Sequence, residues 1–220
     1  MKTILFDLDG TLTDSGEGII NCAILALEHF GLPVPSREEM RVFVGPPLHD
    51  TFIKFGVPAD QTDEAIAIYR SRYIPIGKFE NTPYPGIREM LAALQVNGYK
   101  LFVATSKPET TSVEILEHFD MAKYFTKICG AALDRSRVSK EDVIAYLLEQ
   151  NDAGEEIIMV GDTAFDVIGA KKHGIPTIGV SWGYGSIEEM ERAGAKAIVQ
   201  NAEELFALLT DKCLFCNSNK

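Results

Sequence analysis

The sequence lacks any apolar run close to the roughly 20 residues that a membrane helix needs. Its first residues enter a strand-like segment without the apolar core of a signal peptide. We therefore expect no membrane partner and a cytoplasmic location. Basic residues are also scarce: 21 Lys and Arg stand against 32 Asp and Glu, which gives a formal net charge of −11. Such a surface repels phosphate backbones, so nucleic acid is not an expected partner.

Cysteine is scarce as well, with four residues in a chain of 220. This number is too low and too scattered for a disulfide scaffold. Cys213 and Cys216 form a lone C-x-x-C, and no second ligand pair follows that would complete a zinc site. We expect residues 213–220 to be a tail with reduced thiols, whose role the sequence does not reveal.

Cys129 and Arg135 have the C-x5-R spacing of cysteine-dependent phosphatases. Asp134 lies between them and would oppose both a thiolate and a bound phosphate. We therefore interpret the match as chance, with Cys129 as a small apolar residue. The glycine-rich segment 179–185 lacks the spacing of a dinucleotide-binding loop, and we expect it to form a flexible rim beside the active site.

The sequence does contain an alternation of short apolar strands and amphipathic helices. Four runs are apolar throughout, as buried parallel strands are: 3–6, 101–104, 157–160 and 177–180. Helical spacing of apolar residues marks 87–94, ended by Gly98, and 143–148. The pattern predicts an α/β fold with a doubly wound, mostly parallel, Rossmann-like sheet.

One segment interrupts this alternation. Between Asp14 and Tyr84 the pattern is helical only, with helices expected at 19–30, about 36–44, 48–56 and 60–74. A segment of this length is too long for an ordinary connection between a strand and a helix. We predict an α/β core of residues 1–14 and 82–212, with an inserted all-α cap at 15–81.

Two acidic pairs follow predicted strands. Asp7 and Asp9 come directly after the first strand, and Gly10 permits a sharp turn there. Asp162 ends the strand at 157–160, and Asp166 lies one helical turn later. Helix capping by Asp162 is the simplest alternative for the second pair. The carboxyl ends of parallel strands meet at one crevice, and carboxylates gathered there repel one another unless a cation such as Mg²⁺ joins them.

These motifs resemble those of the haloacid dehalogenase-like phosphatases. The matching positions occur in the family's order: Asp7-Leu8-Asp9-Gly10-Thr11, then Thr105, then Lys140, then Gly161-Asp162-Thr163-Ala164-Phe165-Asp166. The resemblance covers nearly the whole chain. It is strongest to the phosphoglycolate phosphatases, which carry a helical cap.

The resemblance implies a catalytic role for each acidic residue. Asp7 would attack phosphorus and form an aspartyl phosphate, and Asp9 would act as general acid and base. Asp7, Asp162 and the backbone carbonyl of Asp9 would bind Mg²⁺. Asp166 would orient Lys140 or a metal-bound water.

The resemblance also implies the groups that bind phosphate. Thr105 and Ser106 would hold the phosphoryl group, and Lys140 would neutralise its charge. Many relatives have Lys-Pro in this motif, whereas this chain has Ser139-Lys140-Glu141, so Arg137 is the alternative cation.

The predicted function is hydrolysis of a small phosphorylated metabolite, with phosphoglycolate, nucleotides and sugar phosphates all open as substrates. A pyrophosphatase is one alternative. A sugar phosphomutase is another, but the related mutases carry an arginine in a cap segment that reads Gly45-Pro46-Pro47-Leu48 here. The sequence does not distinguish a monomer from a homodimer.

Overall fold

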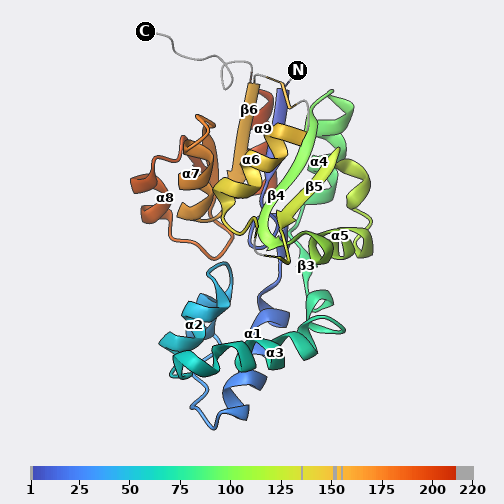
Figure 1. Cartoon of the computed structure of the whole chain (residues 1–220). Helices are drawn as coiled ribbons and strands as arrows, with labels where there is room; N and C mark the ends of the chain where they lie inside the picture. Colours follow the sequence, from blue (N-terminus) through green and yellow to red (C-terminus); the bar gives the residue numbers. More distant parts are fainter. Residues whose placement is uncertain (1, 135, 151–152, 155, 212–220) are drawn as a thin grey trace. The chain divides into compact units, whose positions relative to one another are not determined.

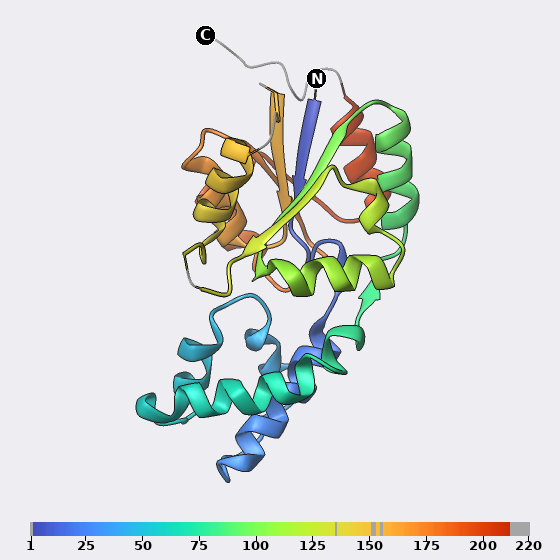
Figure 2. The same cartoon turned by 45° about the vertical axis from the view of Figure 1, so that its right-hand side comes forward.

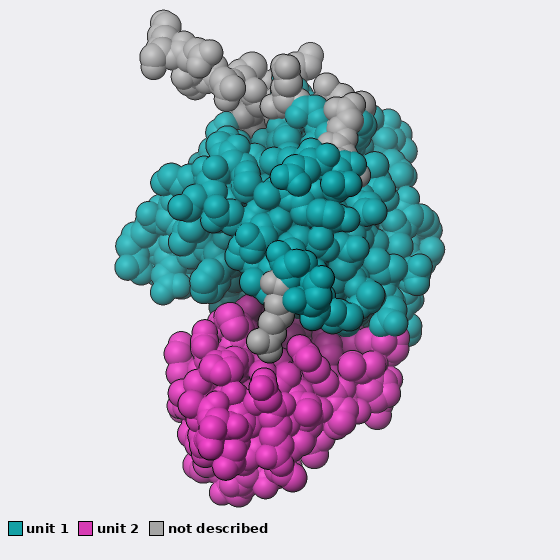
Figure 3. All heavy atoms as spheres, viewed as in Figure 1, with its two compact units in different colours: residues 1–12, 83–220 teal, residues 13–82 magenta. Residues whose placement is uncertain are grey.

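The computed structural model describes residues 2–134, 136–150, 153–154 and 156–211, so the predicted tail at 213–220 lies outside it. The chain divides into two compact units, coloured separately in Figure 3: residues 1–12 with 83–220, and residues 13–82. The predicted cap segment, 15–81, falls within the second unit. No helix in the described part of the chain has the length and apolar character to cross a membrane.

The first unit is built on a six-stranded sheet with the order β5-β4-β1-β6-β7-β8. The strands are β1 Lys2–Phe6, β4 Lys100–Pro108, β5 Lys127–Ala131, β6 Glu156–Gly161, β7 Thr177–Val180 and β8 Ala197–Val199. Neighbouring strands pair in parallel. The predicted α/β fold class is confirmed, although β5 and β8 are not among the four predicted strands.

Helices cover both faces of this sheet (Figures 1 and 2). Ile4 and Phe6 of β1 pack in one apolar core, and Leu5 between them packs in the other. The first core contains residues of α4 Ile87–Val96, α5 Glu109–His118 and α9 Ala202–Thr210; the second contains residues of α6 Lys140–Gln150 and α7 Ala164–Lys171. Helix α8, Ile187–Ala193, contacts α7, and a 3-10 turn, η4 Ala122–Tyr124, precedes β5.

The strand order reverses at β1. From β1 the sheet grows through β4 and β5 on one side, after which the chain crosses to β6, β7 and β8 on the other side. In open α/β sheets, ligands bind outside the carboxyl ends of the strands at such a reversal. A ligand site is therefore expected at the residues that follow β1 and β6.

The second unit is mainly helical. Its elements are α1 Gly16–His29, η1 Glu39–Phe43, α2 Leu48–Lys54, η2 Ala59–Gln61, α3 Thr62–Tyr73 and η3 Gly77–Phe79, where η denotes a 3-10 helix. The helix expected at about 36–44 is thus the shorter 3-10 helix η1. Phe43 and Phe52 meet edge to face with ring centroids 5.1 Å apart inside this unit. The two connecting segments pair as a small ribbon of β2 Thr13–Asp14 and β3 Thr82–Pro83.

Candidate active site

Three aspartates gather at the carboxyl ends of β1 and β6. Asp7 follows β1, and its backbone N–H donates to the carbonyl of Val160 at 2.9 Å, which ties the two strand ends together. Asp162 follows β6, and Asp166 lies in the first turn of α7. One carboxylate oxygen from each of the three lies within 4.8 Å of the others, and all three residues are buried. The structure thus brings together the two strand ends that the sequence singles out.

Lys140, at the start of α6, is the cation of this cluster. Its Nζ atom lies 2.8 Å from Oδ1 of Asp7 and 2.7 Å from Oδ1 of Asp166. It also donates to the carbonyl of Ala104 at 2.8 Å. The two ion pairs and this hydrogen bond together hold the ammonium group beside Asp7 and Asp166.

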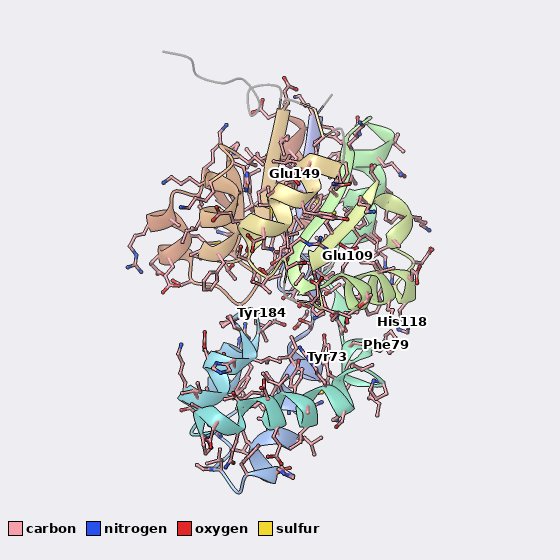
Figure 4. The ribbon with its side chains drawn as sticks, in the orientation of Figure 1. Tyr73, Phe79, Glu109, His118, Glu149 and Tyr184 are labelled. Carbon is pink, nitrogen blue, oxygen red and sulfur yellow. The ribbon has the colours of Figure 1, made fainter. Side chains whose placement is uncertain are left out.

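Arg137, the alternative cation, is engaged elsewhere. Its guanidinium pairs with Glu109 at 2.9 Å and lies 3.8 Å from the ring centroid of Tyr146. Figure 4 labels Glu109, at the start of α5. Lys140 is therefore the residue that the structure places beside Asp7.

Burial dominates the electrostatics of the cluster. It raises the pKa of Asp162 to about 8, and the nearby Asp166 and Asp7 add to this shift. Burial also raises the pKa of Asp7, although Lys140 opposes the shift. Burial alone would lower the pKa of Lys140, but Asp166 and Asp7 outweigh it and raise that pKa. Three buried carboxylates share one ammonium group, so the donor set and its charge fit a hard divalent cation.

Asp166 has two distinct contacts. Its Oδ2 accepts from the backbone N–H of Thr163 at 3.0 Å and from the Thr163 hydroxyl at 2.8 Å, as in a capping box. Its other oxygen pairs with Lys140. Thr163, rather than Asp162, is therefore the N-cap of α7. The carboxylate of Asp162 is left for other partners.

The chain turns sharply after Asp9. Gly10 has a φ of +80°, and a Cβ atom at this position would lie 2.2 Å from Oδ2 of Asp162. The backbone N–H of Leu8 donates to Oδ1 of Asp7 at 2.7 Å. Asp7 and Asp9 consequently face different cations, Lys140 and Lys107. This separation allows the two carboxylates to have different roles.

The end of β4 contributes a hydroxyl group. Thr105 is buried, and its side chain is among the groups that lower the pKa of Asp7. Its Oγ1 accepts from the backbone N–H of Lys107 at 3.3 Å. Ser106 lies next to it and is exposed. The pairing of β4 with β5 is irregular between Ala104 and Pro108, so this stretch departs from a regular strand.

Lys107 is the residue that sequence reasoning missed. Its Nζ atom lies 2.6 Å from Oδ2 of Asp9, and the two side chains are only 7% and 15% exposed. The missed signal is its spacing: Lys107 comes two residues after Thr105, and alternate residues of an extended segment share a side. The prediction ended the strand at Ala104, whereas β4 continues to Pro108.

Comparisons with known proteins find relatives that cover most of the chain. A family model described as haloacid dehalogenase-like hydrolase matches residues 4–180. The 5'-nucleotidase of Pseudomonas aeruginosa is 41% identical over 189 residues, which cover 85% of this chain and 86% of that protein. The tyrosine-protein kinase PtkA of Mycobacterium tuberculosis is 42% identical over 202 residues, which cover 91% of this chain and 69% of that protein.

A solved structure with the same fold adds to these matches. The crystal structure of a predicted phosphatase from Clostridium acetobutylicum has 44% sequence identity and a TM-score of 0.88, and the match covers 94% of this chain and 96% of that one. Proteins named phosphoglycolate phosphatase are also among the relatives, at 28% and 29% identity.

Proposed function

Because this chain belongs to the haloacid dehalogenase-like hydrolase family, as its motifs predict, we propose that it is a magnesium-dependent phosphatase for small phosphate monoesters. The observation that carries the proposal is the position of Asp7. This buried carboxylate lies where the strand order reverses, 2.8 Å from the Lys140 ammonium and beside Asp162 and Asp166. Phosphoryl transfer needs a nucleophile, cations and a proton donor, and the first unit supplies candidates for each.

The proposed reaction has two steps. Asp7 attacks phosphorus and forms an acyl phosphate while the bond to the leaving oxygen breaks, and Asp9 gives its proton to that oxygen. Asp9 then takes a proton from a water molecule, which attacks the acyl phosphate, releases inorganic phosphate and restores Asp7. Lys140 offsets the charge of the phosphoryl group, and Thr105 and Ser106 hydrogen-bond it.

Mg²⁺ fits the residues at this site, because Lys140 alone does not balance three buried carboxylates. We propose Asp7, Asp162 and the backbone carbonyl of Asp9 as its ligands, with Asp166 holding Lys140. The ion would supply charge stabilisation for the transferring phosphoryl group.

The relatives guide the choice of substrate. A nucleoside 5'-monophosphate is the first candidate, because the relative named 5'-nucleotidase spans most of this chain. Phosphoglycolate and sugar phosphates are the other monoesters to test, and pyrophosphate is an alternative because a pyrophosphatase is also among the relatives. A phosphomutase is disfavoured by the missing arginine at 45–48.

The relative named a tyrosine-protein kinase suggests a second fate for the phosphoryl group. An aspartyl phosphate can pass its phosphoryl group to a hydroxyl group instead of water. The sequence has no G-x-x-x-x-G-K loop that would bind a nucleoside triphosphate. We therefore favour transfer of the phosphoryl group to water. Incubation with labelled ATP and a tyrosine peptide would reveal the alternative.

A panel of phosphorylated metabolites assayed for phosphate release with Mg²⁺ tests the proposal. We expect turnover with at least one monoester, loss of turnover in EDTA and recovery when Mg²⁺ is restored. Full activity in EDTA would contradict the metal requirement. Phosphate release by the Asp7→Asn variant at the wild-type rate would contradict the role of Asp7 as the nucleophile.

A further inference from the structure

Residues 181–186, which connect β7 to α8, have no role in the reaction described above. We name this segment the Trp182 loop; Figure 4 labels Tyr184 on it. The sequence predicts a flexible rim over the glycine-rich segment 179–185, of which residues 179 and 180 belong to β7. The structure instead ties the loop to Asp162 and to the segment that follows Asp9.

The first tie is a hydrogen bond to the Asp162 carboxylate. The backbone N–H of Tyr184 donates to Oδ2 of Asp162 at 2.8 Å. The hydroxyl of Thr11 donates to Oδ1 at 3.2 Å. Asp162 is 1% exposed, so these contacts hold both oxygens of a carboxylate that water barely reaches. They fix the direction in which the carboxylate points.

The second tie is close backbone packing that only glycine permits. A Cβ atom on Gly183 would lie 2.3 Å from both Cβ and Oδ2 of Asp162. A Cβ atom on Gly185 would lie 2.0 Å from the backbone carbonyl oxygen of Asp162. A Cβ atom on Gly10, in the segment that follows β1, would likewise lie 2.2 Å from Oδ2 of Asp162. Gly10 and Gly183 thus both approach this carboxylate closely, and a side chain at either position would collide with it.

The third tie anchors the loop itself. The indole N–H of Trp182 donates to the backbone carbonyl of Thr11 at 3.1 Å. The indole ring also lies 6.1 Å from the ring of Tyr84, which packs with it against the first apolar core. Trp182 thus fixes the loop to the segment that carries Thr11, the other residue that donates to Asp162.

From these contacts we propose that the Trp182 loop is a positioning element for the metal site, holding Asp162 in the orientation that binds Mg²⁺. The inference rests on the proposed function, because it assumes a cation at Asp7 and Asp162. A preorganised ligand loses little freedom when the ion binds, so the loop contributes to affinity without touching the ion. The loop acts through Asp162 and takes no part in the chemistry.

Gly183→Ala tests the proposal, with Mg²⁺ affinity measured by isothermal titration calorimetry on the whole chain. The added methyl group must displace either the Asp162 side chain or the loop that holds it, and we expect affinity to fall by at least about 10-fold, as for other residues that orient metal ligands. Gly174→Ala is the control. Gly174 has a positive φ of +69°, which strains an alanine, but a Cβ atom there would meet nothing within 4 Å, so this variant tests a glycine substitution that does not press on Asp162. Wild-type affinity in Gly183→Ala overturns the proposal, as does an equal loss in Gly174→Ala.

A second measurement needs no variant, in case Gly183→Ala does not fold. In the wild-type protein, Mg²⁺ should shift the backbone amide resonance of Tyr184, because its N–H is bonded to the ligand Asp162. The amide of Gly174 should not move. An unmoved Tyr184 amide at saturating Mg²⁺ overturns the proposal. A wild-type protein that binds no Mg²⁺ would instead refute the metal requirement of the proposed function, so the two failures are distinguishable.

Discussion

The ammonium group of Lys107 lies 2.6 Å from Oδ2 of Asp9, whereas Oδ1 of the same carboxylate is buried and accepts no hydrogen bond among the described residues. One oxygen of Asp9 is thus held by Lys107, and the other has no hydrogen-bond partner among the described residues. A general acid and base must be held in place relative to the leaving oxygen and the attacking water molecule. We therefore expect Lys107 to position Asp9.

The Lys107→Met variant should lose more activity toward alkyl phosphates than toward p-nitrophenyl phosphate. An alkoxide is a poor leaving group and depends on protonation by Asp9, whereas p-nitrophenolate departs without it. General acid catalysis typically contributes at least about 10²-fold, so the loss on an alkyl ester should approach this size. Measured kcat/KM values on the two esters provide the test, because they report the step in which Asp9 protonates the leaving oxygen, and Lys107→Arg should recover part of the activity. An equal loss on both esters would indicate a merely structural role.

The Asp7→Asn variant should keep its fold and lose at least about 10³-fold in kcat, because an amide cannot form an acyl phosphate. Mass spectrometry of the wild-type protein during turnover should detect an added phosphoryl group that the variant never carries. Cys129→Ser is the control. Burial raises the pKa of the Cys129 thiol to about 11, so it is not a thiolate near neutral pH, and the variant should remain active. The opposite pattern would favour a cysteine nucleophile.

The metal-free protein should become less stable as the pH rises. Burial raises the pKa of Asp162 from its usual 3.8 to about 8, so between these values the folded state holds a proton that the unfolded chain has released. The free energy of unfolding therefore falls with rising pH across this window. In EDTA we expect a lower Tm near pH 8 than near pH 5.5, with a weaker dependence in Asp162→Asn. Identical profiles for the two proteins would show that Asp162 does not retain the proton.

The sequence predicts that Asp7 and Asp162 lie close together, as they do, because its signals are local. Asp7 and Asp162 each follow an apolar run that folds as a central strand, and parallel pairing then brings the strand ends together. Strands β5 and β8 lie at the two edges of the sheet. Strand β5 begins with the charged Lys127, and β8 is only 3 residues long. Edge strands of this kind give a weak pattern.

The contacts that the sequence did not reveal join distant segments. Lys107 and Asp9 are far apart in the chain, and their pairing depends on the irregular end of β4. Tyr184 reaches Asp162 through its backbone, which no side-chain pattern encodes. Such contacts follow from tertiary packing rather than from residue type.

Substrate preference should reside in residues 13–82. Every side chain that we assign to the chemistry belongs to the first unit, including Asp7, Thr105 and Asp162, and the second unit is inserted directly after the first motif. We propose that side chains of this helical unit select the substrate. A chimera tests this: residues 13–82 are replaced by the matching segment of a relative that prefers a different substrate. The ratio of kcat/KM values between two metabolites should follow the inserted segment, while turnover of p-nitrophenyl phosphate stays within a few-fold, because the reacting groups are unchanged. A folded chimera that keeps the original preference would place specificity in the first unit instead.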